Sequence, residues 1–272
     1  MKGFFSYVSE MKPIKLAISG KGGVGKTTVA ALLSRSFADM GYSVLAVDAD
    51  PDANLASALG FTEDMNITPL TAMKELIEER TGAKAGSSGG FFKLNPKVDD
   101  LPEMIWREKN GIRIMLMGTV QKGGGGCVCP ESAVLKALMA HLLVYRNEAV
   151  ILDMEAGIEH LGRATAGAVD RLIIVVEPGK RSIDTALKIV ELAHDIGLND
   201  VSLIANKIRT EQDRDFILRA AKGLNVLGFL SFNEAFVKAD MQRIPAREAD
   251  PGCLAQGREI AEKLLAEKEG SA

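Results

Sequence analysis

Short, continuous apolar runs alternate along the chain with longer segments in which apolar residues recur every three or four positions. Uninterrupted runs are typical of strands buried on both faces of a parallel sheet, and the longer spacing is typical of helices that cover such a sheet. The predicted strands are 14–18, 44–47, 112–117, 149–152, 172–176, 201–205 and 226–230, and the predicted helices include 29–37, 70–80, 130–142, 182–196 and 253–267. The pattern predicts an α/β fold: one doubly wound domain over residues 1–272, with a mostly parallel sheet of about seven or eight strands and helices on both faces.

Two stretches fall outside this alternation. Residues 1–12 precede the first predicted strand and are expected to form an N-terminal arm, unless the chain starts at Met11. Residues 61–111 have weak periodicity and contain the Ser-Ser-Gly-Gly run at 87–90, which predicts an insertion of loops and short helices. Such an insertion can serve either as a partner surface or as a variable lid.

The segment 20–28 reads Gly-Lys-Gly-Gly-Val-Gly-Lys-Thr-Thr and fills the template of a phosphate-binding loop, or Walker A motif. It lies between a predicted strand and a predicted helix, where free backbone N–H groups and the positive end of the helix favour bound phosphate. The alternative, a glycine-rich turn that only joins strand to helix, does not explain the complete template. We therefore predict a P-loop nucleotide site for ATP or ADP, with Mg²⁺ on the Thr27 hydroxyl. The expected binding residues are Gly22, Gly23, Val24, Gly25, Lys26, Thr27 and Thr28.

Polar residues follow three of the predicted strands. Asp50 and Asp52 come after the strand 44–47, Asp153 after 149–152, and Asn206 after 201–205. Open α/β sheets bind ligands at the carboxyl ends of their strands, so these side chains are candidates for the same site. Aspartate before a helix is also a common cap and asparagine a common turn residue, so a purely structural role stays open for each.

Two cysteines, Cys127 and Cys129, follow four consecutive glycines and precede Pro130. Pro130 is expected in the first turn of a helix, which places Cys129 at the N-cap, where the helix dipole favours a thiolate. Two sulfurs do not complete a tetrahedral site, but a two-fold dimer would present four. We predict an intersubunit Zn²⁺ or Ni²⁺ site; ordinary cysteines or a redox dithiol are the alternatives.

Lys21 adds a second lysine to the phosphate loop, at a position that the general template leaves free. With it, the loop resembles that of the deviant Walker A ATPases, the family of MinD, ParA and the nitrogenase iron protein. The resemblance implies a nucleotide-sandwich homodimer in which Lys21 reaches the phosphates of the partner and, with Lys26, serves catalysis. It also implies that Asp50, in switch I, orients the attacking water.

The same resemblance assigns roles to three further residues. Asp153 corresponds to the Walker B aspartate, which holds a magnesium-bound water. Gly157 corresponds to the switch II glycine, whose peptide can turn toward the γ-phosphate. Asn206, in an Asn-Lys pair, corresponds to the asparagine that pairs with the edge of adenine.

The run 153–162, taken with the upstream Cys-Val-Cys-Pro, is similar to carbon monoxide dehydrogenase maturation ATPases of the CooC type. This closer resemblance extends over most of the chain. It implies an ATP-dependent metallochaperone that delivers nickel to carbon monoxide dehydrogenase as its client. ATP binding and hydrolysis would then switch the dimer and its shared metal ion.

Composition excludes several kinds of partner. The formal net charge is −3, which gives no electrostatic reason to expect nucleic acid or an anionic membrane as a partner. No apolar run approaches the roughly 18 residues of a membrane span, and the first residues lack the features of a signal peptide. Three cysteines do not form a disulfide scaffold, so a reducing, cytoplasmic location is expected.

Three other classes of protein share parts of this pattern. A division- or partition-type positioning ATPase has the same loop, but its membrane-bound form would end in a basic amphipathic helix, and this tail contains several glutamates. An iron–sulfur carrier or scaffold could also place cysteines at a dimer seam. A P-loop kinase would leave Lys21 and the cysteine pair without a purpose.

Overall fold

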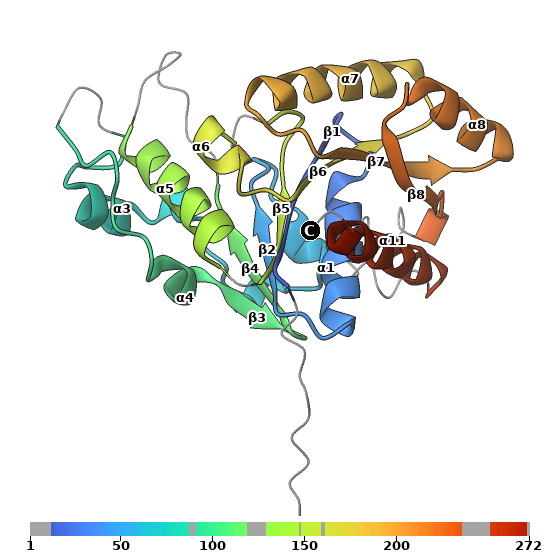
Figure 1. Cartoon of the computed structure of the whole chain (residues 1–272). Coiled ribbons are helices and arrows are strands. Elements are labelled where there is room, and N and C mark those ends of the chain that lie inside the picture. Colours follow the sequence, from blue (N-terminus) through green and yellow to red (C-terminus); the bar gives the residue numbers. More distant parts are fainter. Residues whose placement is uncertain are drawn as a thin grey trace, which may run out of the picture.

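The computed structural model describes residues 12–86, 91–118, 129–146, 148–158, 161–235 and 251–270. One eight-stranded sheet, with strand order β3-β4-β2-β5-β1-β6-β7-β8, forms the centre of this part of the chain (Figure 1). The strands are β1 (Ile14–Gly20), β2 (Val44–Asp48), β3 (Arg107–Lys109), β4 (Ile112–Leu116), β5 (Ala149–Asp153), β6 (Arg171–Val176), β7 (Val201–Ile208) and β8 (Asn225–Ser231). Only the β3–β4 pair is antiparallel. The predicted α/β class and mostly parallel sheet are confirmed.

Helices cover both faces of the sheet. They are α1 (Lys26–Asp39), α2 (Leu55–Ala58), α3 (Lys74–Thr81), α4 (Leu101–Ile105), α5 (Pro130–Tyr145), α6 (Arg163–Ala166), α7 (Lys180–Asp195), α8 (Glu211–Ala220) and α11 (Pro251–Gly270), with 3-10 turns η1 (Glu63–Met65) and η2 (Leu70–Ala72). One core lies between the sheet and α5, α7 and α8, and the other lies between the sheet and α1 and α11 (Figure 1). Neighbouring β1 residues Ala17 and Ile18 belong to opposite cores, which explains why neither face of the strand is exposed to solvent.

Strand β1 lies at the centre of the sheet, between β5 and β6. All seven of its residues are buried. Its carboxyl end meets the carboxyl ends of β2, β5, β6 and β7 along one edge, because all five strands run parallel. The polar residues that follow those strands in the sequence are thereby brought together.

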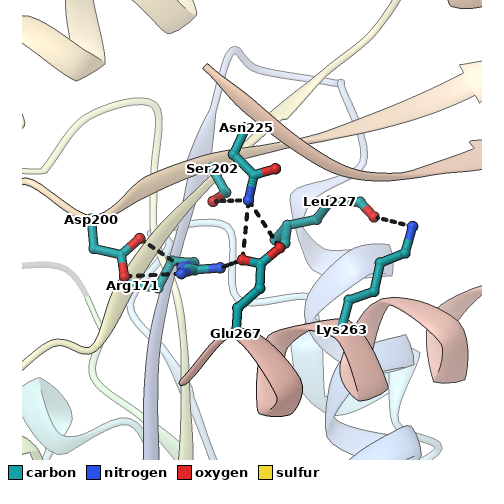
Figure 2. Close-up of polar contacts among 7 residues, drawn as sticks. All are labelled: Arg171, Asp200, Ser202, Asn225, Leu227, Lys263 and Glu267. Carbon is teal, nitrogen blue, oxygen red and sulfur yellow. Dashed lines mark hydrogen bonds and ion pairs between the residues drawn. The ribbon is translucent and has the colours of Figure 1, made fainter. Parts of the chain in front are cut away.

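The C-terminal helix α11 is attached to the sheet by a polar cluster at the amino ends of β6, β7 and β8 (Figure 2). Arg171 donates to both oxygens of Asp200, at 2.7 and 3.0 Å, and also pairs with Glu267 of α11. Asn225 donates to Glu267 at 3.1 Å. These contacts hold α11 in one position along β8 and α1.

Parts of the fold were not predicted from the sequence. The edge strand β3 and helix α8 were missed, although α8 begins with a capping box in which Thr210 accepts from the Asp213 N–H at 3.2 Å. The predicted helix 70–80 is divided into η2 and α3 at Met73. Within the described residues, no helix is long and apolar enough to cross a membrane.

Candidate nucleotide-binding site

The phosphate loop connects β1 to α1, as its template requires. Gly25 caps α1 in the left-handed conformation, at φ 95°, and a Cβ atom there would lie 2.3 Å from the Asn206 amide nitrogen. A Cβ atom on Gly20 would lie 2.4 Å from the Val175 carbonyl oxygen. Only glycine fits these two positions, so the loop is closely packed against β6 and β7.

Lys26 and Asp50 face one another across the loop. The Lys26 ammonium is 3.9 Å from Asp50 Oδ2, and the lysine side chain is only 8% exposed. Asp50 is held in turn by the Asp52 N–H, which donates to Oδ1 at 3.0 Å. The structure therefore brings together two of the three residues predicted to serve catalysis.

Asp48 is a site residue for which the sequence suggested no role. Its carboxylate accepts from the N–H groups of Asp50, at 3.1 Å, and Leu55, at 2.9 Å. It thus fixes the segment predicted as switch I, from the end of β2 to the start of α2. Burial is the main cause that raises the pKa of Asp48 to about 6. The sequence did contain one indication of this role, because Asp48 is the polar residue that ends an apolar strand.

Asp153 ends β5 and is completely buried. Among the residues that the structure describes, neither carboxylate oxygen has a hydrogen-bond partner. Burial raises the pKa of Asp153 to about 7; the Thr27 hydroxyl, which is nearby, lowers it, and Asp48 adds a smaller increase. A carboxylate with two unpartnered oxygens beside a hydroxyl is a suitable environment for Mg²⁺, which prefers oxygen ligands and takes the rest from phosphates and water. Thr27 and Asp153 are therefore the residues that would hold Mg²⁺ directly or through a water.

Asn206 and Lys207 stabilise the phosphate loop from β7. The Asn206 amide donates to the Val24 carbonyl at 2.8 Å, while its oxygen accepts from the Lys207 N–H. The Lys207 ammonium donates to the Gly23 carbonyl and pairs with Glu177 at 2.9 Å. The Asn206 amide is thus engaged with the loop, and its contact with adenine stays a prediction. The role of Lys207 was not predicted.

Gly157 lies in the segment after β5, beside the end of β1. The Ser19 hydroxyl is 2.7 Å from the Gly157 carbonyl oxygen and 3.2 Å from its amide nitrogen. The predicted switch glycine therefore contacts the residue that immediately precedes the phosphate loop. The sequence analysis did not identify Ser19, although it is a polar residue at the end of an apolar strand.

Lys21 is half-exposed at the start of the loop. Within the described part of the chain, no hydrogen bond or ion pair is formed by its ammonium group. Gly22 and Gly23, which follow it, are exposed. This position leaves the group available, and its action across a dimer stays a prediction.

Of the two predicted metal-binding cysteines, Cys129 is described and Cys127 lies outside the described residues. Cys129 caps α5, as predicted, and its sulfur accepts from the Ser132 N–H at 3.4 Å. Across the six described ranges, no group of three or more His, Cys, Asp or Glu side chains could hold a metal ion. An intersubunit site needs only two sulfurs from each chain, so this finding does not test it.

A cleft of about 1220 Å³ opens above these residues. Its lining includes residues of the phosphate loop, residues near the end of β7 and residues that follow β2 and β8. These are Gly22, Gly23, Gly25, Lys26, Thr27, Thr28, Asp50, Asp52, Ala53, Asn54, Asn206, Lys207, Phe232 and Asn233. The phosphate loop lies in this cleft beside carboxylates suited to Mg²⁺. The fold and this arrangement define the class: a P-loop nucleotide-binding protein.

Comparison with known proteins identifies the family. The profile described as the CobQ/CobB/MinD/ParA nucleotide binding domain matches residues 15–246. The chain belongs to this family and is an ATPase.

Individual relatives agree with this assignment. The chain is 45% identical over 254 residues to the carbon monoxide dehydrogenase accessory protein CooC of Rhodospirillum rubrum, covering 93% of this chain and 96% of that protein. It is 47% identical over 230 residues to the ATP-binding protein MJ0823 of Methanocaldococcus jannaschii, covering 84% and 88%. The MinD chain in the MinC:MinD cell division complex of Aquifex aeolicus has the same fold, with a TM-score of 0.67, 19% identity and coverage of 94% and 96%.

Proposed function

We propose that this protein is an accessory ATPase for the assembly of carbon monoxide dehydrogenase, and that it handles nickel for that enzyme in the cytoplasm. The single observation that carries the proposal is the 45% identity to the CooC accessory protein over almost the full length of both chains. The phosphate loop alone would not distinguish this function from that of a positioning ATPase, because both classes use the same kind of nucleotide site.

The nucleotide cycle uses residues of this chain in the following roles. Lys26 and the loop N–H groups bind the phosphates of ATP, and Thr27 and Asp153 hold Mg²⁺. Asp50 positions the attacking water, and Lys21 of each chain reaches the phosphates bound by the other. Asn206 supports the loop and recognises adenine. Two chains therefore close around two nucleotides and separate after hydrolysis.

The metal site is formed by Cys127 and Cys129 of both chains, with Ni²⁺ or Zn²⁺ shared across the dimer axis. The N-cap position of Cys129 supports this role, because its sulfur lies at the amino end of α5 and accepts a hydrogen bond from the Ser132 N–H. Since metal and nucleotide both favour the dimer, each raises the affinity for the other.

The oligomeric state tests this proposal. Chromatographic mass is measured with metal, with a non-hydrolysable ATP analogue, with both and with neither. We expect a dimer with either ligand, and about one Ni²⁺ or Zn²⁺ per dimer by equilibrium dialysis. A monomer under all four conditions would contradict the dimeric cycle.

Cysteine variants provide the matched comparison. Replacing both Cys127 and Cys129 with serine should abolish the shared ion, whereas Cys253→Ser should leave it bound, because Cys253 is buried at the start of α11. Metal binding that survives in the double variant would rule out the cysteine site.

The client is tested by activating nickel-free carbon monoxide dehydrogenase. Activation at limiting Ni²⁺ should increase when this protein and Mg-ATP are added together, and it should not increase with Asp50→Ala. Equal activation by the Asp50→Ala variant would show that hydrolysis is not coupled to metal delivery.

A further inference from the structure

Ser19 is a buried hydroxyl at the point where β1 becomes the phosphate loop. It has no exposed surface and is followed directly by Gly20. Because side chains alternate along a strand, Ser19 lies on the same face of the sheet as Ala17, opposite the face of Ile18. A hydroxyl in this apolar setting costs free energy unless it is hydrogen-bonded.

Among the described residues, every hydrogen bond of the Ser19 side chain is made with the segment after β5. Its Oγ donates to the Gly157 carbonyl at 2.7 Å and lies 3.2 Å from the Glu155 carbonyl. It also accepts from the Gly157 N–H at 3.2 Å, an N–H that it shares with the Glu155 carbonyl at 2.8 Å. One side chain therefore engages both backbone groups of the glycine predicted to respond to the γ-phosphate.

These bonds restrict the movement that the switch requires. When the Gly157 peptide turns so that its N–H faces a phosphate, the N–H can no longer donate to Ser19. The turn also displaces the neighbouring carbonyl groups from the hydroxyl. The conformation in the structure is thus favoured by bonds that the switched conformation must break.

We propose that Ser19 is a positioning residue that holds the Gly157 N–H on its own hydroxyl and so opposes the response to the γ-phosphate. This inference rests on the proposed nucleotide cycle and on the switch role that the resemblance to deviant Walker A ATPases implies for Gly157. Ser19 is also the residue directly before Gly20, so its hydrogen bonds connect Gly157 to the start of the phosphate loop. Removal of the hydroxyl should therefore favour the triphosphate state without changing the residues that contact nucleotide.

The first test compares affinities for Mg²⁺ with a non-hydrolysable ATP analogue and for Mg-ADP, by calorimetry on dilute protein. We expect Ser19→Ala to increase the preference for the triphosphate about 5- to 10-fold, the range that loss of one net hydrogen bond implies. Ser34→Ala is the matched control, because Ser34 is an equally buried serine on α1 whose hydroxyl has no hydrogen-bond partner among the described residues. The Ser34→Ala variant should have the same preference for the triphosphate over ADP as the unmodified protein.

The second test needs no nucleotide. Amide hydrogen exchange of residues 154–158 should be faster in Ser19→Ala than in the unmodified protein and unchanged in Ser34→Ala. If Ser19→Ala does not fold, Ser19→Cys, which keeps a weak donor of similar size, should give a smaller change in the same direction.

The outcomes separate this inference from the proposed function. An unmodified protein that binds neither nucleotide refutes the nucleotide cycle itself. An unmodified protein that binds both, combined with a Ser19→Ala preference that is unchanged or shifted toward ADP, refutes the role of Ser19. Unchanged exchange at residues 154–158 refutes it as well.

Discussion

Asp48 and Asp153 occupy paired positions on the neighbouring parallel strands β2 and β5, and both are fully buried. Each carboxylate lies at the carboxyl end of its strand, beside the phosphate loop. Burial raises the pKa of both side chains, to about 6 for Asp48 and about 7 for Asp153, and each is raised further by a neighbouring aspartate. Without a bound cation, the carboxyl groups of Asp48 and Asp153 therefore stay protonated at mildly acidic pH, where exposed aspartates are ionised.

The first prediction concerns the pH dependence of stability. A carboxyl group whose pKa is raised by folding stabilises the folded state below its unfolded pKa, near 4, and this contribution is lost as pH rises through the folded value. We expect the nucleotide-free protein to lose stability between pH 4 and 7. Asp153→Asn should remove much of this loss and raise the free energy of unfolding at pH 8 by roughly 2–4 kcal/mol. Urea unfolding from pH 4.5 to 8 measures the loss of stability in the unmodified protein and the gain in the Asp153→Asn variant.

Two controls make this result specific. Asp184→Asn replaces an exposed aspartate on α7 and should leave the pH profile unchanged. Saturating Mg-ATP should stabilise the unmodified protein most at high pH, since the cation favours the ionised carboxylate. An Asp153→Asn profile that runs parallel to the unmodified one would mean that Asp153 is ionised without a cation.

The second prediction concerns the glycine that caps α1. Alanine at position 25 combines a left-handed backbone with a Cβ atom 2.3 Å from the Asn206 amide nitrogen. We expect Gly25→Ala to lower the free energy of unfolding by at least about 2 kcal/mol and to abolish ATP binding, because the clash displaces the amide that supports Val24. Thermal unfolding and calorimetry measure the two effects.

Comparison variants separate the two causes. Adding Asn206→Ala should relieve the clash but not the backbone strain, so the double variant should recover only part of the stability. Gly22→Ala should be tolerated in the folded state, because a Cβ atom there would lie more than 4 Å from any other atom of the described part of the chain. A loss of stability in Gly22→Ala equal to that of Gly25→Ala would contradict this explanation.

The sequence predicted the sheet and the phosphate loop because their signals are local. Apolar runs mark buried strands, and the loop residues are contiguous. The N-cap at Cys129 was predictable for the same reason, since Pro130 and the helix follow it directly. Edge strand β3 was missed because its burial pattern is not that of a core strand.

Ser19, Lys207 and the role of Asp48 could not be predicted in the same way. Ser19 acts through Gly157, 138 positions away, and Lys207 acts through Gly23, 184 positions away. Their residue types also have common structural roles in isolation, such as ending a strand or facing solvent. Only the parallel arrangement of β1, β5 and β7 makes their contacts with the loop and the switch segment evident.

The third prediction concerns the attachment of α11. Arg171 is 11% exposed and pairs with Asp200 and Glu267, which are 49% and 39% exposed. Arg171→Met keeps the apolar stem and leaves two carboxylates that water can solvate, so the expected loss is only about 1–2 kcal/mol of unfolding free energy. Arg258→Met breaks an exposed pair within α11 and should cost less than about 0.5 kcal/mol. Equal losses in urea unfolding would show that the Arg171 cluster does not hold the helix.

The last prediction tests whether Lys21 acts on the nucleotide of its own chain or of its partner. Lys21→Ala and Asp50→Ala should each reduce ATP hydrolysis severely, roughly 100-fold or more, because each lacks one part of the catalytic group. An equimolar mixture of the two variants shows whether Lys21 acts within its own chain or across the dimer. If Lys21 acts across the dimer, one site in each mixed dimer combines an intact Asp50 with an intact Lys21 from the partner.

Random pairing then makes half of the dimers mixed, each with one active site of two, so the mixture should recover about a quarter of the unmodified activity. If Lys21 acts within its own chain, no site is complete and nothing is recovered. Lys188→Ala, on the exposed face of α7, is the control and should be fully active alone. Mixed with Asp50→Ala, it should give about the average of the hydrolysis rates of the two proteins measured separately. Recovery of ATP hydrolysis in the mixture of Lys21→Ala and Asp50→Ala requires the two proteins to exchange subunits. The mixture is therefore incubated without nucleotide before ATP is added.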